Sequence, residues 1–270
     1  MHYVTKGQGR LMVLLHGFPE FWYSWRFQIK ELGKYFKVVA PDLRGYNKTD
    51  KPEGVENYKI NILINDILGL VKGLGEEKAI IVGHDWGGAL SWEFAKCFPD
   101  NIEKLIILNC PPIGVLQKSM TTNKEQSKRS QYIVFFQQPE VPEQMLSASN
   151  YAGLKSTYKS MAVKKELWDK ETLNKFVEAL KLPTLSCGIN YYRASFQFPM
   201  RAKQRKLKVK CPTLVIWGEK DTALGKELTY HFPDIVEGPY TIKYIPTAGH
   251  WVQQEEPELV NKYILEFLGV

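Results

Sequence analysis

The stretch GHDWGG at residues 83–88 places Asp85 between two glycines. The spacing Gly83-x-Asp85-x-Gly87 is that of a nucleophile elbow, the sharp strand-to-helix turn that exposes an attacking side chain. A carboxylate there needs no base to activate it, because its reference pKa of about 4 leaves it ionised at pH 7. The chemistry open to this residue is nucleophilic displacement. Read alone, the pattern fits equally well an aspartate that caps the following helix.

An acid and a histidine follow later in the chain, each after a strand-like run. Asp221 ends WGEKD (217–221), beyond the run PTLVIWG, and His250 ends IPTAGH (245–250). The order nucleophile, acid, histidine is that of hydrolases built on a nucleophile elbow. In such a site the acid fixes the imidazole tautomer and stabilises its protonated form. This context favours Asp85 as a nucleophile over the cap interpretation.

The motif HGFP at residues 16–19 follows the apolar run RLMVLL. In elbow hydrolases, the loop after this strand and the residue after the nucleophile each supply one backbone N–H to an oxyanion hole. Phe18 and Trp86 occupy those two positions. The alternative is a tight turn made by glycine and proline, without a role in catalysis.

Short apolar runs alternate with amphipathic segments, which predicts an α/β fold with a mostly parallel central sheet flanked by helices. Strand-like runs cover 10–17, 37–42, 78–83, 103–109, 212–218 and 240–246, and helical periodicity covers 22–34, 60–73, 87–98 and 257–268. The stretch from 113 to 206 is helical in pattern and lacks a buried-strand run. We expect a core of residues 1–112 and 207–270 and a helical cap, 113–206, over the carboxyl edge of the sheet, where open α/β sheets bind ligands.

The composition limits the classes of partner. Of 270 residues, 44% are hydrophobic and 24% charged, which is ordinary for a globular protein. The net charge is +7, but its densest cluster, RAKQRKLKVK (201–210), has no nucleic-acid-binding motif around it. No membrane-spanning run, signal peptide or metal-ligand spacing is visible. The sequence begins within a strand-like pattern, so whether a further strand or a membrane anchor precedes it is not decided by the sequence.

The cysteines bear on the compartment. Cys97, Cys110, Cys187 and Cys211 are widely spaced and include no CxxC pair. This usage favours reduced thiols and a cytoplasmic protein. Cys110 and Cys211 lie in apolar, strand-like surroundings, so we expect both to be buried.

Six segments together resemble the α/β-hydrolase-fold epoxide hydrolases, in their soluble and single-domain branch. They are HGFPEFWYSWR (16–26), APDLRGYNKTDKP (40–52), GHDWGG (83–88), NYYRA (190–194), WGEKD (217–221) and GHWVQQEEPE (249–258). The resemblance implies a capped α/β-hydrolase fold, no cofactor, and conversion of an epoxide to a vicinal diol through an enzyme ester. The chain departs from the family in showing no strand before HYVTKG. The sequence therefore does not predict which strand forms the first edge of the sheet.

The resemblance also gives the residues their roles. An epoxide offers a saturated carbon, so Asp85 would open it by backside displacement and become esterified. Water activated by His250, with Asp221 behind it, would then hydrolyse the ester. The backbone N–H groups of Phe18 and Trp86 would stabilise the oxyanion of this second step.

Two tyrosines complete the implied site. Epoxide opening leaves an alkoxide, and a phenol with a pKa of about 10 stays protonated at pH 7 yet is more acidic than an aliphatic alcohol. Family members carry two such tyrosines in the cap. By motif position they correspond to Tyr132, in YIVFFQQP (132–139), and Tyr192, in NYYRA. Tyr191 is the expected decoy, which packs without a chemical role.

Two alternative functions remain open. Haloalkane dehalogenases share GHDWG, the aspartyl ester and the tryptophan found here as Trp86, but they typically have an asparagine where this chain has Phe18. Fluoroacetate dehalogenases, which act on a haloacid, place an arginine at the position of Trp86. The second alternative is a catalytically silent hydrolase fold that serves as a binding module, although every catalytic position holds a usable residue.

The expected partners are a small apolar or aromatic epoxide and water, with detoxification as the role and with no nucleic acid. Side chains that could line an apolar pocket, as ligand sites usually are, include Phe18, Trp22, Trp86, Phe135, Phe196 and Trp251. The sequence does not specify the preferred epoxide, its stereochemistry, or whether the protein is a monomer or a homodimer.

Overall fold

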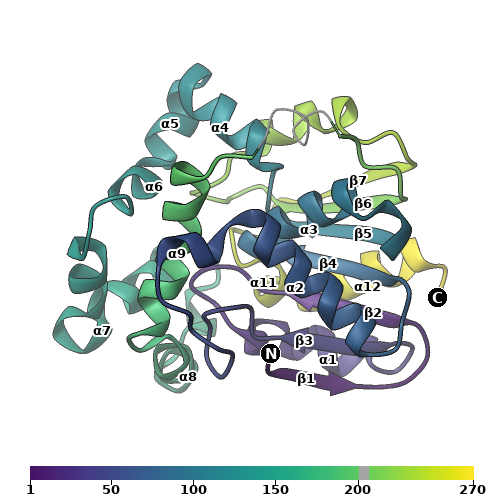
Figure 1. Ribbon diagram of the computed structural model, residues 1–270, viewed down its shortest axis with the longest axis horizontal. Coiled ribbons are helices and arrows are strands. Elements are labelled where there is room, and N and C mark those ends of the chain that lie inside the picture. The colour runs from purple at the N-terminus through teal and green to yellow at the C-terminus, as the bar shows by residue number, and fades with distance from the viewer. Residues whose placement is uncertain (201–206) are drawn as a thin grey trace.

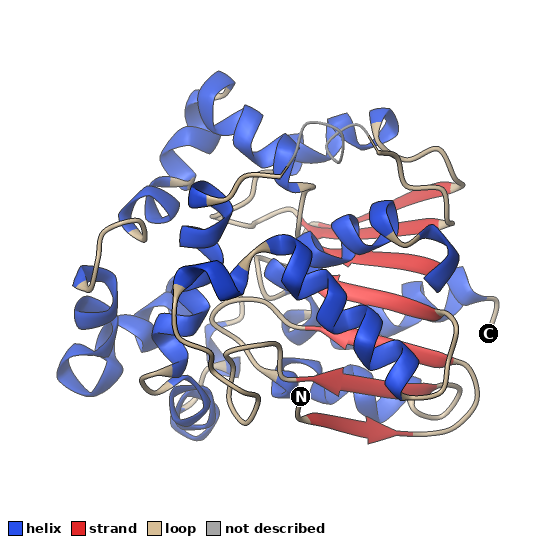
Figure 2. Ribbon diagram, viewed as in Figure 1, coloured by secondary structure: helices blue, strands red, loops and turns tan. Residues whose placement is uncertain are grey.

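The computed structural model describes residues 1–200 and 207–270, which contain a seven-stranded sheet (Figure 2). The order is β1-β3-β2-β4-β5-β6-β7, and all neighbours are parallel except β1 and β3. The strands are β1 (Tyr3–Lys6), β2 (Leu11–Leu15), β3 (Lys37–Pro41), β4 (Ala79–His84), β5 (Ile102–Leu108), β6 (Thr213–Gly218) and β7 (Tyr240–Ile245). The prediction of a mostly parallel sheet is confirmed, and its first edge is the short antiparallel strand β1.

Apolar runs explain why the central strands form. Every side chain of β2, β4 and β6 is buried, as expected for parallel strands covered by helices on both faces. Alternate residues face opposite layers of the core. In β2 one layer receives Leu11, Val13 and Leu15, and the other receives Met12 and Leu14.

Helices cover both faces of this sheet (Figure 1). On one face lie α2 (Ile60–Gly73) and α3 (Trp86–Cys97), and on the other lie α1 (Arg26–Leu32), α11 (Val252–Glu255) and α12 (Pro257–Leu268). Short 3-10 helices occupy the connections, at Trp22–Trp25, Val55–Tyr58, Pro99–Asn101, Lys165–Leu167 and Lys226–Asp234. The helical ranges expected for the core agree with these bounds to within a few residues.

The described part of the chain between β5 and β6 is mostly helical, apart from connecting loops and Val209, which forms an isolated β-bridge with Val236. Its helices are α4 (Ile113–Thr122), α5 (Lys124–Arg129), α6 (Gln131–Phe135), α7 (Val141–Met161), α8 (Lys170–Leu180) and α9 (Thr184–Gln197), and α7 departs from helical geometry at residues 148–151. These helices gather at the end of the sheet toward which the parallel strands point (Figures 1 and 2). The expected end of the cap at residue 206 and most of the basic cluster 201–210 lie outside the described residues.

Two further expectations concern membranes and cysteines. Among the described residues, no helix combines the length and apolar character needed to cross a bilayer. The four cysteines all lie in the described part of the chain and form no disulfide, and Cys110 is buried as expected. The expectation for Cys211 is wrong, because this residue precedes the first residue of β6 and stays partly exposed at the amino edge of the sheet.

Candidate active site

Asp85 lies on a sharp turn between β4 and α3. Its backbone angles of φ +48° and ψ −122° fall in a region that side-chain-bearing residues rarely adopt. The turn depends on its glycines, since a Cβ at Gly83 would lie 2.3 Å from the Gly87 carbonyl oxygen and one at Gly87 would lie 2.0 Å from that of Leu15. The Asp85 side chain makes no capping hydrogen bond to α3. The geometry is therefore that of a strained elbow that presents a carboxylate, and not of a helix cap.

Asp221 and His250 meet beside this carboxylate. His250 Nδ1 lies 2.7 Å from Asp221 Oδ2, and His250 Nε2 lies 3.7 Å from Asp85 Oδ2. Asp221 Oδ1 accepts hydrogen bonds from the backbone N–H groups of Ala223 and Leu224, at 2.8 and 2.9 Å. The acid is thus held in place, and the imidazole lies between the two carboxylates.

Asn109, at the end of β5, holds the acid from its other side. Its Nδ2 donates to Asp221 Oδ2 at 2.8 Å, and its Oδ1 accepts from the backbone N–H of Gly218 at 2.8 Å. Asn109 was not among the site residues predicted from the sequence. The available signal was the adjacency of β5 and β6, which brings the ends of both strands to one point of the sheet edge.

Electrostatics set the protonation of this pair. Burial alone would lower the pKa of His250, but the charge and hydrogen bond of Asp221, followed by the charge of Asp85, outweigh burial and raise the pKa to about 9. Burial opposes ionisation of Asp221 in turn, yet the charge and hydrogen bond of His250 lower the pKa of this carboxyl below its usual value. In the resting protein at pH 7, His250 is therefore protonated and Asp221 is ionised.

The backbone of the HGFP loop reaches the nucleophile. The N–H of Phe18 donates to Asp85 Oδ1 at 2.7 Å. Trp86 is the first residue of α3, and the first N–H groups of a helix have no partner within it. One carboxylate oxygen of Asp85 is thereby bound by a backbone donor, while the other, Oδ2, faces His250.

A fully buried carboxylate beneath the HGFP loop connects the loop to the histidine. Glu20 Oε2 accepts from the backbone N–H of Gly17 at 3.0 Å and lies 2.7 Å from His84 Nδ1. His84 Nε2 in turn lies 2.8 Å from the backbone carbonyl oxygen of His250. Burial would raise the pKa of Glu20, but the charge and hydrogen bond of His84 and the Gly17 N–H lower it to about 2. The sequence analysis missed Glu20, although it directly follows the HGFP motif.

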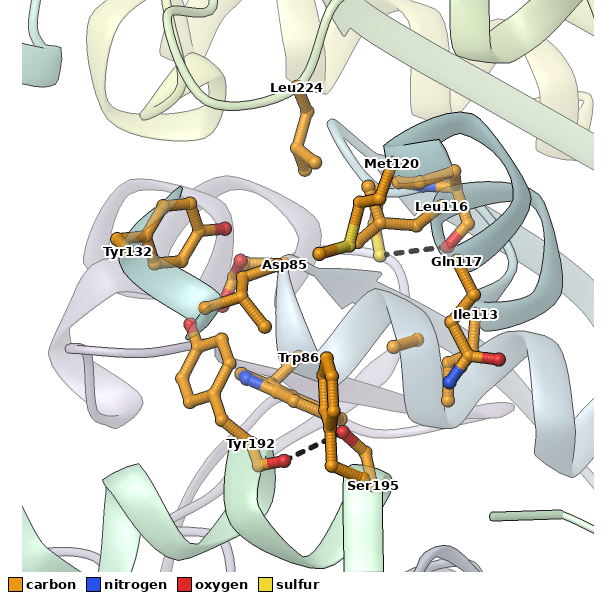
Figure 3. A pocket seen from close by; sticks show the side chains of 15 residues that line it. Asp85, Trp86, Ile113, Leu116, Gln117, Met120, Tyr132, Tyr192, Ser195 and Leu224 are labelled. Carbon is orange, nitrogen blue, oxygen red and sulfur yellow. Dashed lines mark hydrogen bonds between the residues drawn. The ribbon is translucent and has the colours of Figure 1, made fainter. Parts of the chain in front are cut away.

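The two predicted tyrosines lie opposite Asp85, on α6 and α9. Their ring centroids are 5.9 Å apart with an edge-to-face geometry, and Figure 3 shows both hydroxyl groups directed toward Asp85. Burial, followed by the charge of Asp85, raises the pKa of Tyr132 and of Tyr192 well above that of a free phenol. Both phenols are protonated donors at pH 7. Tyr191 points elsewhere, since its hydroxyl donates to the Arg44 carbonyl oxygen at 2.7 Å.

Two cavities meet at these three residues, because Asp85, Tyr132 and Tyr192 line both of them. The first, which we call the Met120 cavity, has a volume of about 60 Å³, and its apolar wall includes Ile113, Leu116, Met120 and Leu224 (Figure 3). The second, the Arg129 cavity, has a volume of about 300 Å³ and also contains Phe18, Arg129, Phe135 and His250. A substrate bound at the junction could extend in two directions.

Comparison with known proteins places the chain in a family. A sequence profile described as the alpha/beta hydrolase fold matches residues 10–257. The chain is 40% identical over 276 residues to Epoxide hydrolase 1 of Caenorhabditis elegans, with 100% of this chain and 68% of that protein covered. It is 39% identical over 276 residues to Epoxide hydrolase 3 of Mus musculus, with 99% and 73% covered. The chain belongs to the epoxide hydrolases of the α/β-hydrolase fold.

A solved structure agrees with this assignment to the epoxide hydrolase family. The crystal structure of Bacillus megaterium epoxide hydrolase in complex with an inhibitor matches with a TM-score of 0.90 at 33% identity. The match covers 100% of this chain and 96% of that chain. The similarity therefore extends over the whole length of this chain.

Some of the aromatic side chains that were predicted to line the substrate pocket lie outside both cavities. Phe135 lines the Arg129 cavity and Phe196 lines the Met120 cavity. Trp22 contacts Phe21 and Tyr23 and lines neither cavity. Trp251 is fully buried beside His250, at 4.8 Å between ring centroids, and also lines neither cavity. Aromatic character could not separate pocket walls from core, because both surroundings are apolar.

The described residues also bear on metal binding. Within residues 1–200 and 207–270, no group of three or more histidine, cysteine, aspartate or glutamate side chains could hold a metal ion. The Nε2 atom of His16 accepts a hydrogen bond from the backbone N–H of Leu43 at 3.0 Å.

Proposed function

We propose that the protein hydrolyses an epoxide to a vicinal diol through a covalent ester on Asp85, with residues 113–206 as the cap that closes the site. The observation that carries the proposal is the placement of one carboxylate against two protonated phenols at the junction of two cavities. The names of the relatives support the same reaction.

The first half-reaction is alkylation of Asp85. Because the N–H of Phe18 holds Oδ1, the attacking atom is Oδ2, which displaces the epoxide oxygen from one carbon by backside attack. The C–O bond of the ring breaks as the Asp85 ester forms. Tyr132 and Tyr192 donate to the departing oxygen, and their protons stabilise the charge that would otherwise build up on an alkoxide.

The second half-reaction is hydrolysis of the ester. Neutral His250 takes a proton from water, and the resulting hydroxide attacks Cγ of Asp85. The negative charge falls on Oδ1, where the N–H groups of Phe18 and Trp86 stabilise it. The intermediate then collapses with cleavage of the bond between Cγ and the ester oxygen, and the leaving alkoxide takes the proton of the added hydroxyl. The diol leaves with one oxygen from Asp85, the carboxylate is restored, and His250 keeps the proton that it took from water.

The proton count connects the two halves. In the resting site His250 carries a proton because Asp221 and ionised Asp85 raise its pKa to about 9. Esterification removes the charge of Asp85, so the pKa of His250 falls. Alkylation leaves one alkoxide that needs one proton, and His250 must lose one proton to become a base. The proton that His250 loses is the one that the alkoxide gains. No proton therefore has to be exchanged with solvent between the half-reactions.

We expect the hydrolysis half-reaction to accelerate as pH rises and then to level off. The reactive form of His250 is the neutral one, so the rate follows deprotonation with an apparent pKa below 9, the value for the resting site. The measurement is the decay of the ester in rapid-mixing experiments, followed by tryptophan fluorescence between about pH 6 and 9. A decay rate that is flat or falls over this range would show that His250 is not the base.

Removal of either phenol hydroxyl should slow alkylation. We expect Tyr132→Phe and Tyr192→Phe each to lower its rate about tenfold to a hundredfold, and the double variant about 10²–10⁴-fold. Tyr191→Phe is the matched control, since that hydroxyl binds the Arg44 carbonyl away from Asp85. The measurement is the single-turnover rate of ester formation. An alkylation rate equal in the double variant and in the control would contradict the proposed role of the pair.

The dehalogenase alternative uses the same nucleophile but a different leaving group. In this chain Phe18 offers only its backbone N–H, and that N–H is bound to Asp85, whereas the phenol pair faces the position where an epoxide oxygen would lie. The deciding experiment incubates the wild-type protein with styrene oxide and, separately, with 1-chlorobutane. Diol from the first without chloride from the second supports the proposal. Chloride release without diol would support a dehalogenase, and neither product would support the silent binding protein.

The cellular compartment, the kind of substrate and the biological role of the protein are also proposals. The four cysteines, which form no disulfide, fit a reducing compartment such as the cytoplasm. Among the residues that the structure describes, Asp85 is the only charged side chain in the wall of the Met120 cavity, which fits a substrate with an apolar end. We propose removal of reactive epoxides as the role.

A further inference from the structure

Glu255, the last residue of α11, is a buried carboxylate that takes no direct part in the two half-reactions. Its Oε1 accepts a hydrogen bond from the backbone N–H of Gly249 at 3.2 Å. Its Oε2 accepts from the backbone N–H groups of Val163 and Lys164, at 2.8 and 3.0 Å. The two oxygens of one carboxylate therefore join two segments that are far apart in the sequence.

The segments that Glu255 joins belong to the cap and to the loop of the catalytic histidine. Val163 and Lys164 connect α7 to the 3-10 helix Lys165–Leu167 in the cap. Gly249 directly precedes His250 in the loop after β7. The cap is thereby bonded to the residue next to the histidine that acts in hydrolysis.

Other contacts hold the same two segments together. A Cβ at Gly249 would lie 2.9 Å from the carbonyl oxygen of Met161, the last residue of α7, which leaves no room for a side chain. The indole Nε1 of Trp251, which follows His250, donates to the carbonyl oxygen of Tyr158 in α7 at 3.0 Å. The histidine loop is thus packed directly against the end of α7.

The partners of Glu255 favour its ionised form. Burial raises the pKa of its carboxyl, and hydrogen bonds from the backbone N–H groups of Lys164, Val163, Gly249 and Trp251 oppose this effect. A carboxylate accepts at both oxygens, whereas a side-chain amide or a protonated carboxyl turns a hydrogen toward a backbone donor on one side. The ionised acid can therefore bind both segments at once.

From these contacts we propose that Glu255 is a positioning residue for His250, because it bonds the peptide before the histidine to the cap and so fixes the imidazole relative to the Asp85 ester. The inference rests on the proposed function. Asp221 orients the ring through Nδ1 at 2.7 Å, and His84 Nε2 lies 2.8 Å from the His250 carbonyl oxygen. Glu255 adds a third constraint, on the residue that precedes the histidine.

Hydrolysis of the ester should depend on Glu255 more than alkylation does. Alkylation uses Asp85, Tyr132 and Tyr192, which lie outside the two segments that Glu255 joins. Hydrolysis requires the imidazole within hydrogen-bond distance of a water molecule that faces Cγ of Asp85. A displacement of about 1 Å, caused by a change away from the reacting atoms, can lower a rate about a hundredfold.

The test mixes excess protein rapidly with styrene oxide and follows formation and decay of the ester by tryptophan fluorescence. Glu255→Gln keeps the size of the side chain but loses an acceptor on one side. We expect the ester to decay about tenfold to a hundredfold more slowly in this variant and to form at a rate close to that of the wild type. Glu255→Asp keeps the charge but is one methylene too short to bond both segments, so it should slow decay as well.

Glu256→Gln is the matched control. The Oε1 atom of Glu256 lies 2.9 Å from Lys164 Nζ and accepts from the Thr247 hydroxyl at 2.7 Å. This substitution removes an ion pair between cap and core but leaves the Gly249 N–H bonded to Glu255. Both rates should therefore stay close to those of the wild type.

The two rates separate a positioning role from a structural one. Loss of folded protein would lower the amplitudes of both phases and leave both rates unchanged. Decay of the ester at the wild-type rate in Glu255→Gln or in Glu255→Asp would overturn the inference while the proposed function stands. Formation and decay slowed by the same factor would also overturn it, because the residue would then support the site as a whole. If the wild-type protein forms neither ester nor diol, the proposed function itself fails.

Discussion

Replacement of Asp85 by alanine should lower diol formation by about 10⁴-fold or more, because the variant lacks the atom that attacks the epoxide. Asp221, the carboxylate that remains beside His250, cannot replace it. Asp221 is bound by His250, Asn109 and two backbone N–H groups, and it lies behind the imidazole. The measurement is chromatographic detection of diol from styrene oxide.

The control for this variant is an aspartate outside the site. Asp100 is exposed in the short 3-10 helix Pro99–Asn101, and Asp100→Ala should retain wild-type turnover. Alanine at position 85 keeps a side chain at the same strained backbone position, so circular dichroism should show that the variant folds. Turnover by folded Asp85→Ala at the wild-type rate would refute the assignment of the nucleophile.

Replacement of His250 by glutamine should have a different effect, because it removes the base but leaves the nucleophile. We expect steady-state turnover to fall about 10²–10⁴-fold. Alkylation should continue, so one equivalent of epoxide is consumed and the ester accumulates. The intact protein should then gain the full mass of the substrate, and proteolysis should place this mass on the peptide that contains Asp85.

A matched substitution tests whether the effect is specific to the site. His231 is exposed in the Lys226–Asp234 segment, and His231→Gln should neither slow turnover nor accumulate an adduct. A His250→Gln protein that stays unmodified after incubation with epoxide, while the wild type produces diol, would indicate that no ester lies on the path.

Much of the fold could be predicted from the sequence because the central strands have a clear sequence pattern. Runs such as AIIVG and TLVIWG are buried on both faces, so they are continuously apolar and end in glycine at the sheet edge. The edge strand β1 was harder to predict, since it is short, mostly exposed and held by pairing with β3. Its side chains carry little of the pattern that marks a buried strand.

Some residues of the candidate site could likewise be predicted from the sequence, and others could not. Asp85, Asp221 and His250 follow predicted strands directly, so topology alone brings them to one edge. Asn109 and Glu20 act through hydrogen bonds whose partners are distant in sequence, and a single sequence gives no direct sign of such contacts. Trp22 and Trp251 were predicted to line the pocket but line neither cavity. Hydrophobicity predicts burial but does not distinguish a cavity wall from packed core.

The central claim is that oxygen passes from Asp85 to the product, and isotope transfer in a single turnover tests it most directly. Excess protein is mixed with epoxide in water enriched in heavy oxygen, and both the diol and the Asp85 peptide are analysed by mass spectrometry. The account predicts unlabelled diol and one heavy oxygen in the Asp85 carboxylate. Labelled diol from the first turnover, with an unlabelled Asp85 peptide, would mean that water attacks the epoxide itself and would contradict the account.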